Sequence, residues 1–123
     1  MYNENGIKEN VCNLSYLSEA MGNKAPQIKG ILQAFRMQVP EELDTLKIAI
    51  AHADFKTIKS FAHTMMSTVS ILGITSLAPI LNEMEALGAK NEDLERIKEL
   101  NMHLVLVCGY AMEEVEEILP AYL

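Results

Sequence analysis

Apolar residues recur along most of this chain at intervals of three and four positions. That spacing places them on one face of an α-helix, whereas a half-buried strand needs strict alternation, which no stretch of the sequence sustains. The chain has only three Phe, four Tyr and no Trp, and no Asn-Gly turn separates two β-branched segments. The clearest stripes are Ile28, Ile31, Leu32, Phe35 and Val39, and then Leu94, Ile97, Leu100, Leu104, Val107, Met112, Val115 and Leu119. The sequence therefore predicts an all-α protein.

Capping and turn residues divide this pattern into helices. The expected helices are a short one that Ser15 caps and Gly22 ends, a second from Ala25 and Pro26, a third over Phe55 to Leu72, a fourth from Thr75 or Ser76 with Pro79 in its first turn, and a last one between Asn91 and Pro120. Asp54 is the expected N-cap of the third helix and Gly73 its C′ residue. Pro40 either kinks the second helix or starts a new one. A loop is expected at 88–91.

The lengths of the helices and of their connections predict how they pack. Long helices joined by short loops pack as antiparallel neighbours. We therefore predict one domain over residues 1–123, an antiparallel up-down-up-down four-helix bundle with a short N-terminal helix laid across one end. Residues 1–13 are expected to form a polar lead-in to this domain.

The charge balance excludes several classes of function. Lys and Arg number 10 against 17 Asp and Glu, which gives a net charge of −7 and argues against nucleic acid as a partner. We also expect no membrane association and a cytoplasmic location, because no apolar run approaches roughly 20 residues and the N-terminus does not resemble a signal peptide. Cys12 and Cys108 are expected to be reduced and to fill space in or near the core, and no metal site is predicted. The acidic pairs Glu113-Glu114 and Glu116-Glu117, which Val115 interrupts, are expected on the solvated side of the last helix.

The third predicted helix carries a histidine on its polar face. At about 100° per residue, six apolar residues fall within one arc of roughly 100°, which is the expected buried face. These residues are Ile58, Phe61, Ala62, Met65, Val69 and Leu72. His63 lies roughly 150° from the centre of this arc. Lys59 lies one turn before it, with Lys56 a further turn back, and Ser67 and Ser70 lie on the following turns.

This arrangement suits a nucleophile that accepts a phosphoryl group. An imidazole that is neutral near pH 7 is a competent nucleophile, and small residues one turn away leave its Nε2 open to a bulky partner. Hydroxyl and ammonium groups beside it can hydrogen-bond a phosphoryl group. Position alone does not assign this role, because a lone histidine on a polar helix face is most often a solvated side chain. His52 is expected as a surface or capping residue and His103 as a boundary residue.

The segment 61–73 resembles the signature of histidine-containing phosphotransfer (HPt) domains. That signature reads roughly Ala-His-x-Leu-Lys-Gly/Ser-Ser, with a Gly a few residues later, and it is matched by Ala62, His63, the apolar Met65, the small Ser67 and Gly73. Further segments resemble other parts of the family. Residues 14–17 resemble its opening helix, and Phe35 with 40–43, 49–50 and 53–54 resembles its long helix and the turn into the histidine helix. Leu81, Met84 and Glu85 resemble its next helix. The resemblance covers residues 14–119.

The resemblance implies a phosphocarrier rather than a stand-alone enzyme. In a two-component phosphorelay, His63 would accept a phosphoryl group from an aspartate of one receiver domain and pass it to another. The receiver would supply Mg²⁺ and positioning, so no cofactor is expected in this chain. The implied partners are response-regulator receiver domains, and a hybrid sensor histidine kinase is a further candidate. The side chains expected around the phosphoryl group are Lys59, Met66, Ser67 and Ser70, and those expected to support docking are Tyr16, Leu17, Met66 and Ser67.

One residue departs from the family pattern. Met66 stands three positions after His63, where the family usually has Lys. A charge-assisted hydrogen bond is worth roughly 1.5–3 kcal/mol, so its loss predicts transfer slower by about one to two powers of ten unless Lys59 substitutes. The alternative is a degenerate HPt fold that binds receiver domains without accepting phosphate. A third reading is a generic helical interaction module in which His63 is incidental.

Overall fold

The structure contains helices and no strand over the part of the chain that it describes. This computed structural model describes residues 5, 9–20, 22 and 24–122, apart from the side chains of Tyr16 and Ala20. The helices are α1 (Ser15–Ala20), α2 (Ala25–Ala51), α3 (Phe55–Ile71), α4 (Ala78–Lys90) and α5 (Leu94–Ile118), with the short 3₁₀ helices η1 (Thr75–Leu77) and η2 (Leu119–Tyr122). The predicted all-α fold is therefore confirmed.

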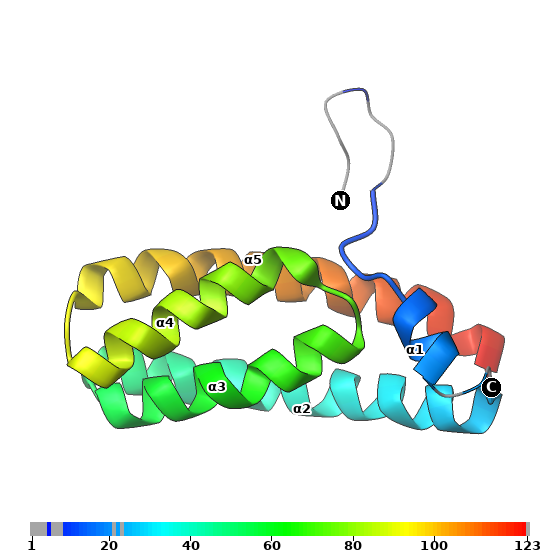
Figure 1. The fold of residues 1–123 in the computed structure, drawn as a ribbon, viewed down its shortest axis with the longest axis horizontal. Helices are drawn as coiled ribbons and strands as arrows, with labels where there is room; N and C mark the ends of the chain where they lie inside the picture. Colours follow the sequence, from blue (N-terminus) through cyan, green and yellow to red (C-terminus); the bar gives the residue numbers. More distant parts are fainter. Residues whose placement is uncertain (1–4, 6–8, 21, 23, 123) are drawn as a thin grey trace.

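The four long helices form a bundle around one apolar core. The main contacts join α3 to α2 and α4, and α5 to α2 and α4, so α3 and α5 occupy opposite corners. Figure 1 shows α1 at the end of the bundle where α2 begins and α5 ends. Every long helix contributes fully buried side chains, among them Leu32, Leu46, Ile58, Met65, Leu81, Met84, Ile97 and Leu104. In the described part of the chain, no helix is both long and apolar enough to cross a membrane.

Both ends of α3 are fixed by the residues that the sequence predicts. The Asp54 carboxylate accepts hydrogen bonds from the Thr57 backbone N–H at 3.2 Å and from its hydroxyl at 2.7 Å, and these bonds lower the pKa of Asp54. At the other end, Gly73 has a φ of 65°. A Cβ there would collide with the backbone oxygen of Asn13, so glycine is required for space as well as for backbone conformation.

In the middle of the chain, the structure excludes one of two alternatives at Pro40 and contradicts one predicted boundary. α2 continues through Pro40 to Ala51, so this proline does not start a new helix. α4 continues to Lys90 and ends at Asn91, which has a left-handed backbone. The predicted loop at 88–91 was therefore wrong for three of its residues. Glycine is typical of turns, which is why the sequence predicts a loop at Gly88, but this residue is buried inside α4.

The start of α1 also differs from the prediction. Ser15 is the first residue of the helix rather than its cap. Its backbone N–H donates instead to Asn13 Oδ1 at 3.1 Å, so the capping side chain comes from two residues earlier. α1 ends at Ala20, and Gly22 follows with a φ of 59°, in agreement with the predicted stop.

Residues 11–13, here called the N-terminal strap, join the ends of two helices. The backbone N–H groups of Val11 and Cys12 donate to the two oxygens of Glu114 on α5, at 2.8 and 2.9 Å. The Asn13 N–H donates to the carbonyl oxygen of Leu72 at 2.9 Å. Glu114 is only 2% exposed, so the expectation that it lies on the solvated side of the last helix was wrong. The end of the predicted polar lead-in is thus attached to the bundle.

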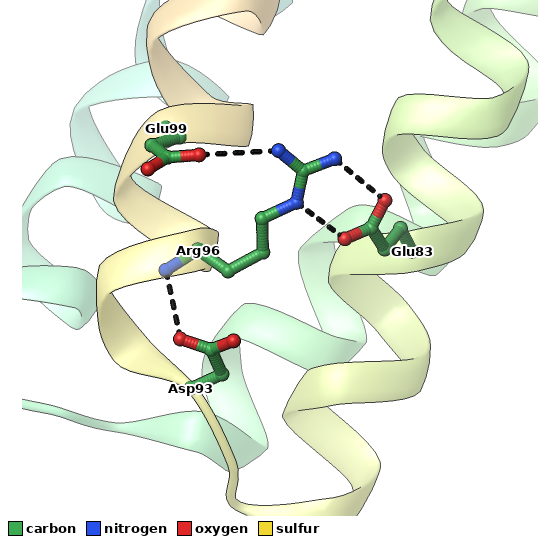
Figure 2. A network of polar contacts seen from close by, with 4 residues as sticks. All are labelled: Glu83, Asp93, Arg96 and Glu99. Carbon is green, nitrogen blue, oxygen red and sulfur yellow. Dashed lines mark hydrogen bonds and ion pairs between the residues drawn. The ribbon is translucent and has the colours of Figure 1, made fainter.

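An exposed arginine joins α4 to the first turn of α5 (Figure 2). Arg96 donates from Nε and an η nitrogen to the two oxygens of Glu83 at 2.6 and 3.0 Å, and from the other η nitrogen to Glu99 at 3.1 Å. Its backbone N–H donates to the N-cap Asp93 at 3.1 Å. Hydrogen bonding to Glu83 raises the pKa of Arg96, and the same contact lowers the pKa of Glu83. This bidentate pair links α4 to α5 at the surface, and because both side chains are exposed it contributes little to stability.

The two cysteines pack in or against the core, and burial raises the pKa of each thiol to about 12. For Cys12 the neighbouring Glu114 carboxylate adds to this effect. An unfolded thiol titrates near pH 8.5, so between that pH and about 12 the folded state holds more protons than the unfolded state. The free energy of unfolding should therefore fall as pH rises above about 9. Urea unfolding at pH 7–10.5 tests this, and Cys12→Ala/Cys108→Ala should show a smaller fall than wild type.

Candidate functional site

His63 lies in the middle of α3, and its side chain is 75% exposed. The opposite face of the helix is buried as the helical wheel predicts, through Ile58, Ala62, Met65 and Val69. Phe61 is only half-buried, because it falls at the edge of the apolar arc. The imidazole is therefore presented on an exposed surface that a large partner can approach.

One ring nitrogen of His63 is held by a carboxylate from the neighbouring helix. His63 Nδ1 lies 2.9 Å from Oε1 of Glu85 on α4. The Glu85 side chain is 29% exposed, so it is shielded more than the histidine that it contacts. An ionised carboxylate only accepts hydrogen bonds, so the neutral imidazole must carry its proton on Nδ1. Its Nε2 then has a free lone pair, which is the form that a nucleophile needs.

A close approach of α3 and α4 underlies this contact. Gly88 lies one turn after Glu85, and a Cβ at Gly88 would be 3.0 Å from the backbone nitrogen of Lys59 and 3.1 Å from its Cβ. Lys59 in turn lies one turn before His63. The missing side chain at Gly88 lets the two backbones come together, which brings the Glu85 carboxylate within reach of the imidazole.

We expect Gly88→Val to separate these helices and to break the contact between His63 and Glu85. The added side chain would press on the backbone of α3, which cannot rotate away, and overpacking of this kind costs about 1–3 kcal/mol of unfolding free energy. Urea unfolding and the NMR shifts of the His63 ring nitrogens measure the two effects. Gly30→Val is the matched control, because Gly30 also lies inside a helix but has open space beyond its Cα. A normal His63 ring spectrum in Gly88→Val would contradict this account.

His63 and its neighbours line an open groove at the junction of α3 and α4. The groove is lined by Lys56, Lys59, Ser60, His63, Thr64 and Glu85. Two lysines therefore line the groove on the N-terminal side of His63, and the Glu85 carboxylate contacts Nδ1 of its ring. Thr64 directs its hydroxyl back to the carbonyl of Ser60 at 3.0 Å. A site with a free nucleophilic nitrogen and two nearby cations is suited to accepting a dianionic phosphoryl group.

The sequence model of the Hpt domain family matches residues 30–119 of the chain. The chain belongs to the Hpt domain family. The match includes all of α3 with His63, all of α4 with Glu85, and α5. It confirms the resemblance seen in the sequence and identifies a phosphotransfer module of two-component signalling. Comparison with curated proteins and with solved structures gave no match.

The structure of this Hpt domain brings some of the predicted site residues together and separates others. Lys59 lines the groove beside His63, as the sequence predicts. Ser67 and Ser70 are exposed on the next turns of α3, beyond the residues that line the groove. Met66 is half-buried and packs against the core, so it only borders the exposed face.

Two residues of α1, Tyr16 and Leu17, were predicted to support docking of a partner. Leu17 is 1% exposed, because α1 lies across the end of the bundle and turns this side chain into the core. The prediction that Leu17 contacts a partner was therefore wrong. The side chain of Tyr16 lies outside the described residues.

The groove of this Hpt domain includes residues that sequence analysis did not assign to the site. Ser60 and Thr64 are exposed and line the groove, whereas the sequence analysis assigned the hydroxyl groups of the site to Ser67 and Ser70. Glu85 was noted only as part of a segment that resembles the family. Its contact with His63 depends on the register between α3 and α4, and helical periodicity within each helix does not determine that register.

The remaining histidines of the Hpt domain lie away from this site. His52 Nδ1 contacts the carbonyl oxygen of Ile48 at 2.9 Å, so it caps the end of α2 as expected. His103 is exposed rather than at a boundary. Among the described residues, no group of three or more His, Cys, Asp or Glu side chains is placed to hold a metal ion.

Proposed function

We propose that this Hpt domain is a phosphocarrier of a two-component phosphorelay, in which His63 carries a phosphoryl group between aspartates of receiver domains. The observation that supports this most is the pairing of His63 Nδ1 with Glu85, which leaves Nε2 as the free nucleophile on an exposed helix face. Response-regulator receiver domains are the proposed partners, together with a hybrid sensor histidine kinase, and the proposed location is the cytoplasm. The proposal also includes an antiparallel up-down-up-down order of the long helices, which their short connections favour.

The proposed transfer is one displacement at phosphorus. The lone pair of His63 Nε2 attacks the phosphorus of an aspartyl phosphate on the receiver. The N–P bond forms while the P–O bond to the receiver carboxylate breaks, and that carboxylate leaves with the electron pair. No proton leaves the ring, because Nε2 carried none. The imidazole becomes cationic, and the Glu85 carboxylate on Nδ1 stabilises that charge.

The lysines of the groove have a separate role in this proposal. Lys56 and Lys59 lie on the N-terminal side of His63, where their ammonium groups can reach oxygens of the transferred phosphoryl group. The receiver would dock over the exposed face that holds His63, Ser67 and Ser70, with Met66 at its edge. Attack on an aspartate of a second receiver reverses the displacement and restores the neutral imidazole.

Label transfer from phosphorylated receiver domains tests the proposal. A panel of receivers carrying radiolabelled aspartyl phosphate is mixed with wild type and with His63→Gln. We expect acid-labile, base-stable label on the wild type and none on His63→Gln. Binding of each receiver is measured in parallel by calorimetry. Receivers that bind the wild type but leave no phosphohistidine on it would reject the carrier function.

The alternative, a degenerate module that binds receivers without accepting phosphate, is favoured by one observation. The position three residues after His63 holds Met66, which packs against the core and brings no positive charge to the face. The experiment above separates the two functions, since the alternative predicts binding without label.

Substitution of Met66 tests how much that missing charge matters. We expect Met66→Lys to speed transfer to His63 by about ten-fold, because it adds a cation beside the developing charge. Lys59→Ala should slow transfer, since this residue is the nearest cation in the groove one turn before His63. The measurement is a label-transfer time course on each variant. Equal rates in all three proteins would show that these charges do not limit transfer, even with the carrier function confirmed.

A further inference from the structure

α5 exposes a row of large apolar side chains that the phosphotransfer site does not use. Met102 is 73% exposed, Val105 46% and Leu106 56%. At about 100° per residue, these residues fall on one face of α5, opposite the buried residues Ile97, Leu100, Leu104, Cys108, Ala111 and Val115. Gly109 falls on the same exposed face, and nothing lies within 4 Å of the position of its absent Cβ. We call these four residues, 102, 105, 106 and 109, the α5 stripe.

The α5 stripe lies away from His63. The helix α5 packs against α2 and α4, whereas His63 is on α3, at the opposite corner of the bundle (Figure 1). A receiver domain seated on this stripe would leave its aspartate out of reach of His63. The occupant of this surface is therefore a different molecule from the partner in phosphoryl transfer.

The order of residues along the stripe is self-complementary. Met102 is a protruding side chain, and Gly109 leaves an open notch seven residues later. Lys98 and Glu113 carry opposite charges and are both exposed on the same side of the helix. Each of these pairs has the same midpoint, between Val105 and Leu106, which are themselves apolar. A two-fold axis through that point would bring Met102 opposite Gly109 and Lys98 opposite Glu113 in both directions.

We propose that the α5 stripe is the interface of a homodimer, in which two copies of this chain cross their α5 helices in antiparallel fashion. Met102 then fills the notch at Gly109 of the partner subunit, and Val105 packs against Leu106 of the partner subunit. A shallow hollow lined by Met102, His103 and Leu106 receives the partner subunit's Val105. Lys98 faces Glu113 of the partner subunit on each side of the axis.

Near the two-fold axis, the charges on the two α5 helices are complementary, because Lys98 of each subunit faces Glu113 of the partner subunit. In the monomer Lys98 forms an exposed ion pair with Glu95 at 3.1 Å, and such a pair is weak enough to be shared. Glu95 falls opposite Glu116 of the partner subunit, but this pair is about 15 Å along the helix from the axis, where crossed helices have diverged. One helix from each subunit makes a small interface, so a weak dimer with a dissociation constant of about 10–100 μM is expected.

Sedimentation equilibrium of the full chain from 10 μM to about 1 mM tests the proposal. We expect the weight-average mass to rise from that of a monomer towards twice that value. Met102→Gln should weaken association by about ten-fold or more, and Met37→Gln should not, although Met37 is 70% exposed on α2. Gly109→Gln should also weaken association by filling the notch. Gly30→Gln is its matched control, because Gly30 is an equally open helical glycine.

A charge exchange tests the register itself. Lys98→Glu should weaken the dimer, and the double variant Lys98→Glu/Glu113→Lys should recover the wild-type dissociation constant. Circular dichroism confirms that each variant is folded. A monomer at all concentrations, or equal effects of Met102→Gln and Met37→Gln, or no recovery in the double variant would overturn the proposal. His63→Gln should associate like wild type, so the outcome is independent of the proposed phosphotransfer function.

Discussion

Replacing Glu114 with alanine is expected to lower the free energy of unfolding by about 2–4 kcal/mol. The Glu114 carboxylate is buried and accepts the backbone N–H groups of Val11 and Cys12 at 2.8 and 2.9 Å. A hydrogen bond to a charged group is worth about 1.5–3 kcal/mol, and removing the carboxylate leaves both donors without an acceptor. The cost of burying the charge is removed at the same time, which keeps the net loss below the sum of two such bonds.

Urea unfolding with two companion variants measures this effect. Glu113→Ala changes the exposed neighbour on the same helix turn and should alter stability by no more than about 0.5 kcal/mol. Glu114→Gln keeps one acceptor oxygen, so its stability should lie between those of wild type and Glu114→Ala. Hydrogen exchange should show that the amides of Val11 and Cys12 lose protection in Glu114→Ala. Equal stabilities of Glu113→Ala and Glu114→Ala would show that the N-terminal strap contributes little to the fold.

The strap also explains why Gly73 is required at the end of α3. Asn13 donates to the Leu72 carbonyl and its own backbone oxygen lies where a Cβ of residue 73 would be. Glu114 holds the other end of the strap on α5. The three residues 11–13 therefore connect the ends of α3 and α5, which are at opposite corners of the bundle, and lead into α1.

The features of α3 that depend on neighbouring residues in the sequence were predicted correctly, whereas the local prediction of Ser15 as a cap was wrong. The limits of α3, its Asp54 cap and its Gly73 terminus follow from local rules of capping and backbone conformation. The exposure of His63 follows from the period of one helix. The same local rules failed at Gly88, because a close approach between two helices also selects glycine, and nothing in the local sequence distinguishes that use from a turn.

Features that depend on distant contacts were not predictable in the same way. Glu114 belongs to a run of acidic residues, and only the strap, about 100 positions earlier in the chain, makes its burial favourable. Glu85 follows the buried Met84, so the helical repeat of α4 places it beside the core. The repeat does not show which residue the Glu85 side chain contacts. Both carboxylates contact groups on other segments, and their roles follow from how the elements pack.

Replacing Glu85 with alanine is expected to slow phosphoryl transfer to His63 by about ten-fold. Without the carboxylate, the proton of the neutral imidazole can occupy Nε2, which removes the lone pair that attacks phosphorus. The charge that develops on the ring also loses its partner. A charge-assisted hydrogen bond is worth about 1.5–3 kcal/mol, and the lower value is appropriate here because the His63 side chain is 75% exposed. That value corresponds to about one power of ten in rate.

Label-transfer rates and ring-nitrogen NMR shifts together test this role for Glu85. Glu85→Gln can still accept from Nδ1, so its ring spectrum above pH 8 should resemble wild type while transfer is slowed by the lost charge. In Glu85→Ala the shifts should report protonation of Nε2 in part of the population. Glu83→Ala is the matched control, because its carboxylate lies on the same helix but pairs with Arg96 (Figure 2). Wild-type transfer rates in Glu85→Ala would show that Glu85 neither orients the ring nor stabilises its charge.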